Sequence, residues 1–231
     1  MAVPPFAAAA PQLLGVLDAE ERARAARFAF DADRDAFVAA HALLRTALGA
    51  ALGISSAAVR FTRAPGGRPE LAGIAAREIT FSLTHTRTLV ACAVGPAVPL
   101  GIDAEAEADT SPDETLLPSC CTPRERAYLE RLDPDCRTRA FAQMWTAKEA
   151  LLKALGVGMM ISPSEVDCAL DPLRVLRAPE VEGRGRWFVR TYEPRPHVAL
   201  TFVAYVPHDL GEPSVAELCD SDYGATVTVT S

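Results

Sequence analysis

Two long segments with helical periodicity, each accompanied by short β-rich segments, limit the possible folds of this sequence more than any other feature. Residues 31–53 carry apolar side chains near the helical spacing and end at a glycine. Residues 138–156 form the second such segment, which a glycine also ends. Because helices and then strands occur twice along the chain, the sequence predicts an α+β protein made of two similar halves.

Shorter elements fill the remainder of each half. Asp18 is a typical N-cap for a helix at 17–28. Thr122 and Glu125 form a capping box for a helix at 122–132. Strand-like segments are expected at 59–71 (with a turn), 78–86, 88–95, 98–106, 165–170, 186–193 and 197–206. The halves are placed at residues 1–101 and 102–208, followed by a polar tail at 209–231.

The composition of the chain excludes several classes of partner. Its 231 residues are 49% hydrophobic, enough for a sizeable core, and the net charge of −7 argues against bulk binding of nucleic acid and against a polybasic membrane anchor. No apolar run reaches the roughly 18 residues that span a membrane. The cysteines form no C-x-x-C pair, which favours reduced thiols over a zinc site or a disulfide framework. We expect a cytoplasmic protein that acts as a monomer.

The segment GIDAEAE places Asp103 and Glu105 two residues apart. On a strand these side chains point to the same face, where two carboxylates repel each other unless a cation lies between them. Mg²⁺ commonly takes one or two protein carboxylates together with phosphate oxygens and water. The alternative is a solvated turn, which Glu107 and Asp109 favour because they continue the acidic run. The segment by itself leaves both interpretations open.

Lys148 and Lys153 are the only lysines of the chain, and every other residue among its 23 basic residues is an arginine. A lysine that persists against such a bias is a candidate for a task that a guanidinium group cannot perform. Lys148 falls within the apolar stripe of its helix and therefore needs a partner charge. Glu149 and Lys153 lie at the edge of that stripe, where they could also be an ordinary surface pair.

Polar and cationic groups also gather around the segment FSLTHT. Thr84 and His85 end the expected strand there, and Arg87 follows. Arg45 on the first long helix and Arg68 in the turn GGRPEL are further cations. Such groups can hold a phosphate, although a single histidine is more often structural and most arginines are simply solvated.

Together and in this order, these pieces resemble the 4′-phosphopantetheinyl transferases of the surfactin-synthetase-activating type. The motifs that carry the resemblance are GGRP at 66–69, FSLTH at 81–85, GIDAE at 101–105 and WTAKEALLK at 145–153. The segment AAHALLRTALG at 39–49 resembles the helix that supplies an arginine to coenzyme A. Arg68 stands where the family often has lysine and Thr84 where serine is common, and both residues keep the required chemistry.

The resemblance implies a fold of two α+β halves related by a pseudo-twofold axis, with the site in the cleft between them. The activity that it implies is Mg²⁺-dependent transfer of 4′-phosphopantetheine from coenzyme A to a serine of an apo acyl, polyketide or peptidyl carrier protein. Asp103, Glu105 and Glu149 would then hold Mg²⁺. Glu149 would also be the base for the serine, directly or through water, and Lys153 would steady or protonate the leaving 3′,5′-ADP. The residues expected to bind coenzyme A are Arg45, Arg68, Pro69, Thr84, His85 and Lys153.

Three expectations remain beside that scheme. Lys148 is expected to be a structural buried cation paired with a carboxylate, with a phosphate contact as the alternative. The segment 116–139, which mixes five arginines with apolar residues, is expected to be the docking face for the carrier, with a helix packed on the core as the alternative. The rival functions are a non-catalytic module that binds coenzyme A or Mg-nucleotide, and a hydrolase of pyrophosphate bonds.

Overall fold

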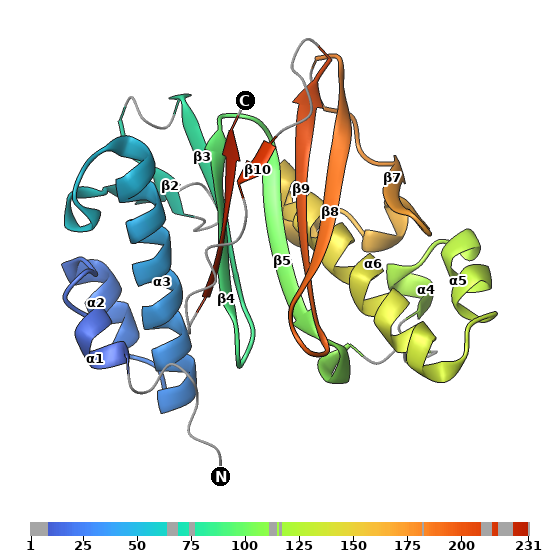
Figure 1. The fold of residues 1–231 in the computed structure, drawn as a ribbon, viewed down its shortest axis with the longest axis horizontal. Coiled ribbons are helices and arrows are strands. Elements are labelled where there is room, and N and C mark those ends of the chain that lie inside the picture. The colour runs from blue at the N-terminus through green and yellow to red at the C-terminus, as the bar shows by residue number, and fades with distance from the viewer. Residues whose placement is uncertain are drawn as a thin grey trace. The chain divides into compact units, whose positions relative to one another are not determined.

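The computed structural model of the chain describes residues 9–63, 69–73, 77–110, 115, 117–181, 183–208, 214–216 and 224–230. The protein divides into two compact units (Figure 1). The first comprises residues up to Ala97 together with Val215–Thr230, and the second comprises Val98–Ser214. In each unit a long helix packs on a β-sheet, so the α+β class expected from the sequence is confirmed.

The first unit is built around one long helix on a mixed sheet. Its elements are α1 (Ala10–Leu13), α2 (Ala19–Ala25), α3 (Asp31–Leu52), η1 (Ser56–Ala58), β1 (Phe61–Arg63), β2 (Pro69–Leu71), β3 (Ile79–His85), β4 (Val90–Pro96), β10 (Ser214–Ala216) and β11 (Gly224–Thr230). The sheet has the order β10-β11-β4-β3, in which β3 is antiparallel and β11 parallel to β4. Helix α3 lies on β4, where Leu44 and Leu48 share an apolar cluster with Phe81, Cys92 and Val94.

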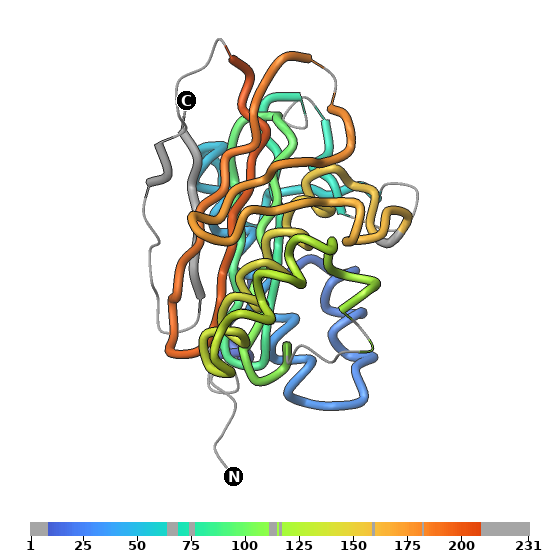
Figure 2. The backbone as a smooth tube through the Cα atoms, turned by 90° about the vertical axis from the view of Figure 1, so that its right-hand side faces the viewer, coloured from blue at the N-terminus to red at the C-terminus, as the bar shows by residue number. Residues whose placement is uncertain are grey.

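The second unit places its long helix on an antiparallel sheet of the order β5-β9-β8. Its elements are β5 (Leu100–Ala106), η3 (Glu107–Asp109), α4 (Leu117–Cys120), α5 (Pro123–Leu129), α6 (Pro134–Leu155), η4 (Gly158–Met160), η5 (Pro163–Glu165), β6 (Asp167–Leu170), β7 (Leu173–Arg177), β8 (Gly185–Arg195) and β9 (Val198–Pro207). Strands β8 and β9 form a long hairpin, orange to red in Figure 2. Helix α6 packs across β5 and β9, and α4 and α5 lie beyond it (Figure 1).

The helix ends follow from local sequence signals. Helix α3 ends at Gly53 and α6 at Gly156, which take the left-handed backbone conformation with φ of 66° and 69°. The expected N-cap Asp18 and the expected capping box at Thr122 are both present, and Asp18 also forms a capping box, with Glu21. Helix α6 begins at Pro134, before the expected residue 138, because Asp133 caps it and a proline suits the first helical position.

Two stretches contain strands that the sequence analysis did not expect. Residues 209–231 were expected to be a polar tail, yet β10 and β11 lie there, and β11 pairs with β4. The alternating threonines and valines of β11 have a high β-propensity, which explains the pairing. Strand β7 pairs with β6 and was also unexpected. The first unit ends at Ala97, a few residues before the boundary placed at residue 101.

Helix α3 is long and apolar enough, by length and composition alone, to cross a membrane. Of that stretch 61% is buried inside the protein, where it packs against β4 and the first two helices. The pattern is that of the core helix of a globular domain.

Candidate active site

Strand β5 and helix α6 approach each other unusually closely, and Gly101 makes this possible. A Cβ atom at Gly101 would lie 1.8 Å from the carbonyl oxygen of Ala150 and 2.9 Å from the backbone nitrogen of Ala154. No residue with a side chain fits there unless one of the two backbones moves. The glycine therefore lets the helix that carries the lysine motif lie directly on the strand that carries the carboxylate motif.

Side chains from both motifs meet beside this contact. Lys153 Nζ donates to Asp103 Oδ1 at 2.6 Å and to the carbonyl oxygen of Ile102 at 3.3 Å. Glu105 projects from the same face of β5 as Asp103, since the two are two residues apart on a strand. Glu149 lies one helical turn before Lys153 on α6. The Asp103 side chain is 7% exposed and that of Lys153 is 33% exposed, so the cluster opens to solvent at its lysine side.

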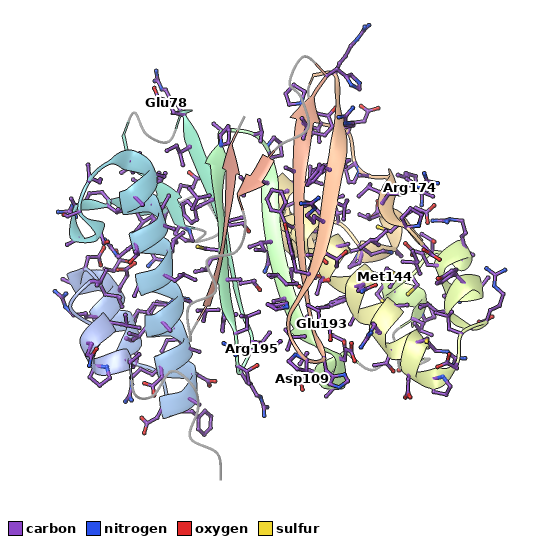
Figure 3. All side chains as sticks on the ribbon, viewed as in Figure 1. Glu78, Asp109, Met144, Arg174, Glu193 and Arg195 are labelled. Carbon is purple, nitrogen blue, oxygen red and sulfur yellow. The ribbon has the colours of Figure 1, made fainter. Side chains whose placement is uncertain are left out.

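The electrostatics show that several carboxylates share this place. Burial, followed by the charge of Asp103, raises the pKa of Glu105 to about 7, and Lys153 only partly offsets this. Asp109, which lies just after β5 (Figure 3), raises it further. Burial and then Asp103 also raise the pKa of Glu149. The negative charge gathered here thus exceeds what one ammonium group neutralises, and an additional cation would be stabilised.

The cluster suits a magnesium ion in its chemistry, although it does not enclose one by itself. No three His, Cys, Asp or Glu side chains in the described part of the chain are arranged so that they could hold a metal ion. Mg²⁺ takes oxygen ligands and usually keeps waters and substrate phosphates beside one or two carboxylates. Asp103, Glu105 and Glu149 are oxygen donors on a strand and a helix that pack on each other, so these residues fit an ion completed by phosphate oxygens.

Lys148 has the structural role expected from its place in the apolar stripe. Its side chain and that of Glu125 are both 0% exposed, and the two form an ion pair of 2.7 Å. Lys148 Nζ also donates to the carbonyl oxygens of Cys120 at 2.7 Å and Pro163 at 3.0 Å. The ammonium group thus has three acceptors for its three protons, and it joins α6 to α4, α5 and η5.

Arg45 was expected to contact coenzyme A, and the geometry speaks against this. Its side chain is 0% exposed and forms ion pairs with Asp18 at 2.5 Å and Glu21 at 2.6 Å. The guanidinium group also donates to the carbonyl oxygens of Val59 at 3.0 Å and Ser56 at 3.3 Å. Arg45 therefore ties α2 and the segment after α3 to α3 itself. The sequence could not reveal this, because the partners are brought to Arg45 only by tertiary packing.

Apart from Lys153 on α6, the remaining candidates for coenzyme A binding lie in the first unit or outside the described residues. Thr84 is buried and His85 exposed at the end of β3, and Pro69 begins β2. Arg68 lies outside the described residues. The contact of these residues with the same coenzyme A as the carboxylate cluster stays a prediction.

The segment 116–139 comprises α4, α5 and the start of α6, while Leu116 itself lies outside the described residues. Arg124 is half exposed and forms an ion pair with Asp167 at 3.1 Å. Arg137 donates to the carbonyl oxygens at the end of α5, and Arg139 pairs with Glu107 at 3.2 Å. Several of these arginines therefore stabilise the unit itself, and a docking role for this face stays a prediction.

The sequence analysis missed two features of the second unit. The motif GIDAE was recognised by its acids, but its glycine is equally needed because β5 touches α6 there. The partner of Lys148 was not identified either, although Glu125 was already known as part of the expected capping box. A buried lysine beside a capping-box glutamate in a neighbouring helix is a signal that could have indicated the pair.

The family models and the known relatives agree with one another. A model described as the 4′-phosphopantetheinyl transferase superfamily matches residues 99–202, and one described as 4′-phosphopantetheinyl transferase, N-terminal, matches residues 4–97. The 4′-phosphopantetheinyl transferase HetI of Nostoc sp. is 37% identical over 161 residues, which is 69% of this chain and 68% of HetI.

A second relative covers more of the chain at lower identity. The 4′-phosphopantetheinyl transferase of Bacillus subtilis is 25% identical over 196 residues, 85% of each chain. Among solved structures, a holo-(acyl-carrier-protein) synthase from Bacillus anthracis str. Ames in complex with CoA (3′,5′-ADP) has a TM-score of 0.41 and 20% identity, and covers 48% of this chain and 96% of that one.

Proposed function

The chain belongs to the 4′-phosphopantetheinyl transferase superfamily, and from this premise we propose how its own residues perform the transfer. The protein is an enzyme that moves the 4′-phosphopantetheine group of coenzyme A to a carrier protein. The alternative of a non-catalytic module that only binds coenzyme A is not supported. The observation that supports the following assignment of roles is the meeting of Asp103, Glu105, Glu149 and Lys153 where β5 lies on α6.

Asp103, Glu105 and Glu149 are the residues that would hold Mg²⁺ against the pyrophosphate of coenzyme A. When bound, the ion supplies positive charge to the pyrophosphate oxygens, which develop charge as the phosphorus–oxygen bond breaks. An ion completed by phosphate oxygens would lie between rigid elements there, since β5 and α6 pack directly on each other at Gly101. Burial and then the charge of Asp103 raise the pKa of Glu105 and of Glu149, and a cation at this place would favour their ionised forms.

The transfer itself needs a base for the serine and a positive group that stabilises the negative charge of the leaving 3′,5′-ADP. The serine oxygen of the carrier forms a bond to the phosphorus next to pantetheine, the bond from that phosphorus to the bridging oxygen breaks, and 3′,5′-ADP leaves. Glu149 takes the serine proton, directly or through a water molecule, because a carboxylate with a raised pKa is a better base near neutral pH. Lys153 turns from Asp103 toward the leaving phosphate and steadies it or gives it a proton.

The proposal also covers the carrier, the remaining contacts with coenzyme A, and the state in which the enzyme acts. The carrier is an acyl, polyketide or peptidyl carrier protein, coenzyme A is bound with the help of Pro69, Thr84, His85 and Arg68, and the enzyme acts as a monomer in the cytoplasm. Carrier proteins are usually acidic and this chain has a net charge of −7, so their recognition depends on a local basic face. The exposed Arg124 and its neighbour Arg126 on α5 are the proposed contacts.

The test is an incubation of the protein with coenzyme A, Mg²⁺ and an apo carrier protein, followed by mass spectrometry of the carrier. We expect the carrier to gain one phosphopantetheine on its serine and one 3′,5′-ADP to appear for each carrier modified. Free phosphopantetheine formed without any carrier would instead indicate a hydrolase. Carriers of all three kinds that stay unmodified would refute the proposal. Reversal of Arg124 and Arg126 to glutamate should raise KM for the carrier more than KM for coenzyme A.

A further inference from the structure

A pair of hydroxyl groups lies in the middle of the apolar interface between α6 and the sheet of the second unit. Thr146 Oγ1 of α6 and Thr201 Oγ1 of β9 are 2.7 Å apart, and both residues are 0% exposed. Buried polar groups lower stability unless they are hydrogen-bonded, and a valine of the same shape would avoid the problem altogether. Because replacing both partners of a buried hydrogen bond by apolar groups of the same shape can be nearly neutral, the pair is a candidate for a role other than stability.

The hydrogen bonds around Thr146 govern the direction of the bond between the two hydroxyl groups. Thr146 Oγ1 lies 2.9 Å from the carbonyl oxygen of Ala142 and 3.1 Å from that of Gln143. A threonine hydroxyl has one proton, so Thr146 donates either to the backbone of its own helix or to Thr201. When Thr146 donates to its own helix, Thr201 donates to Thr146, and in either arrangement the bond between strand and helix is directional.

The pair lies directly beside the residues of the active site. Thr201 is the partner of Asp103 in the pairing of β9 with β5, so the two side chains share one face of the sheet. Thr146 precedes Glu149 by three residues and Lys153 by seven, spacings that place all three on neighbouring parts of one helical face. The hydroxyl pair thus joins β9, at the residue that pairs with Asp103, to the turn of α6 that precedes Glu149.

Small and apolar contacts specify the position of α6 along the strands less strictly than a directional polar contact does. Besides the bonds of Lys153 to Asp103 and to the carbonyl oxygen of Ile102, the contacts described between α6 and β5 are made by small residues such as Gly101 and Ala150. Such contacts fix how closely the helix lies on the sheet, but a directional buried polar contact fixes its register, at some cost in stability.

We propose that the hydroxyl pair of Thr146 and Thr201 is a positioning device, which holds α6 at the one place along β5 and β9 where Glu149 and Lys153 face Asp103 and Glu105. The proposal rests on the proposed function of that cluster. Neither threonine touches the substrates in this scheme, and both act through the residues that they place. Loss of the pair should therefore weaken the binding of Mg²⁺ while it leaves the stability of the protein nearly unchanged.

The test compares variants of the full-length protein. In Thr146→Val with Thr201→Val, both hydroxyl groups are replaced by methyl groups of the same shape, so no buried donor remains without an acceptor. Replacement of both by serine keeps the hydroxyl groups and serves as the rescue. Thr46→Val is the matched control, because Thr46 on α3 makes the same bond to its own helix, 2.9 Å to the carbonyl oxygen of Ala42, in the other unit.

Mg²⁺ binding is measured by calorimetry in the presence of coenzyme A, and Lys153 is located in a crystal structure of the double valine variant. We expect the Kd for Mg²⁺ to rise about 10-fold, the scale of losing a group that orients a metal ligand, with a Tm close to that of the parent. The serine variant and the Thr46 control should bind like the parent. In the crystal structure the contact of 2.6 Å between Lys153 and Asp103 should be lost.

The inference is overturned if the double valine variant keeps that contact. A parent protein that binds no Mg²⁺ would refute the metal assignment of the proposed function, and the crystal structure would then decide the inference by itself. A loss of binding in the Thr46 control that equals that of the double variant would also overturn it, since the effect would then not depend on the pair.

Discussion

The variant Lys148→Met should be much less stable than the parent protein, although the residues of the neighbouring active site are unchanged. The substitution keeps the length of the side chain but removes the cation that forms an ion pair with the Glu125 side chain, which is 0% exposed. Removing one partner of a buried pair typically costs about 3–5 kcal/mol, because the remaining charge stays buried without compensation. For a chain of this size we expect the Tm to fall by about 6–20 °C.

The double variant Lys148→Met with Glu125→Gln separates the charge from the packing. Glu125 also accepts hydrogen bonds from the backbone nitrogens of Thr122 and Cys168, each at 2.7 Å. A glutamine keeps one of these acceptors and brings no net charge, so the double variant should recover about half of the loss. Lys148→Arg should cost about 1–3 kcal/mol by overpacking, since Nζ lies among three oxygens at 2.7 to 3.0 Å.

Urea unfolding followed by circular dichroism measures these free energies, and the transfer rate is measured below the melting transition. A loss below about 1 kcal/mol for Lys148→Met would refute the argument, because it would mean that Glu125 is not a buried charge that depends on Lys148. A double variant that is no more stable than the single variant would refute the electrostatic explanation and leave only packing.

Three further substitutions test other contacts. Gly101→Ala should lower stability by at least about 1–3 kcal/mol and weaken Mg²⁺ binding, because its Cβ would lie 1.8 Å from the carbonyl oxygen of Ala150; an unchanged Tm would contradict the close contact. Arg45→Met should cost about 3–5 kcal/mol and leave KM for coenzyme A unchanged, since Arg45 is buried against Asp18 and Glu21; a stable variant with a raised KM would restore Arg45 to the coenzyme A site. Lys153→Arg should lower kcat by about 10- to 100-fold with little change in Tm, because a guanidinium group does not give up a proton; an undiminished kcat would remove the role of Lys153.

Periodicity and capping signals predicted most of the helices and strands, because these signals are local. Helix α3 extends over Asp31–Leu52 and was expected at 31–53. Strand β11 was not recognised in the same way, since seven residues at the end of a polar stretch become a strand only when β4 offers an edge. The alternating threonines and valines of β11 are a local strand signal, but its pairing with β4, far away in the sequence, is not visible locally.

The buried cations Lys148 and Arg45 show what the sequence can and cannot predict about a buried charge. Lys148 was correctly expected to be structural, because it interrupts an apolar stripe on its own helix. Arg45 was assigned to coenzyme A from the resemblance, but in the structure it donates hydrogen bonds to Asp18 and Glu21, at the start of another helix. Burial of a long cationic side chain follows from tertiary packing, which the pattern of one helix reveals only when the stripe is as regular as that around Lys148.

The central claim is that the carboxylates of β5 and the side chains of α6 form one site. The most direct test measures the transfer rate for Asp103→Ala, Glu149→Ala and the double variant, with Glu105→Ala as a third probe of the same strand. Residues that act as a unit give losses that do not multiply. We predict that the double variant is about as slow as the slower single variant, and that Asp103→Ala and Glu105→Ala each raise the Mg²⁺ concentration needed for half-maximal rate. A double variant whose loss is the product of the two single losses would contradict the claim, because the strand and the helix would then act independently.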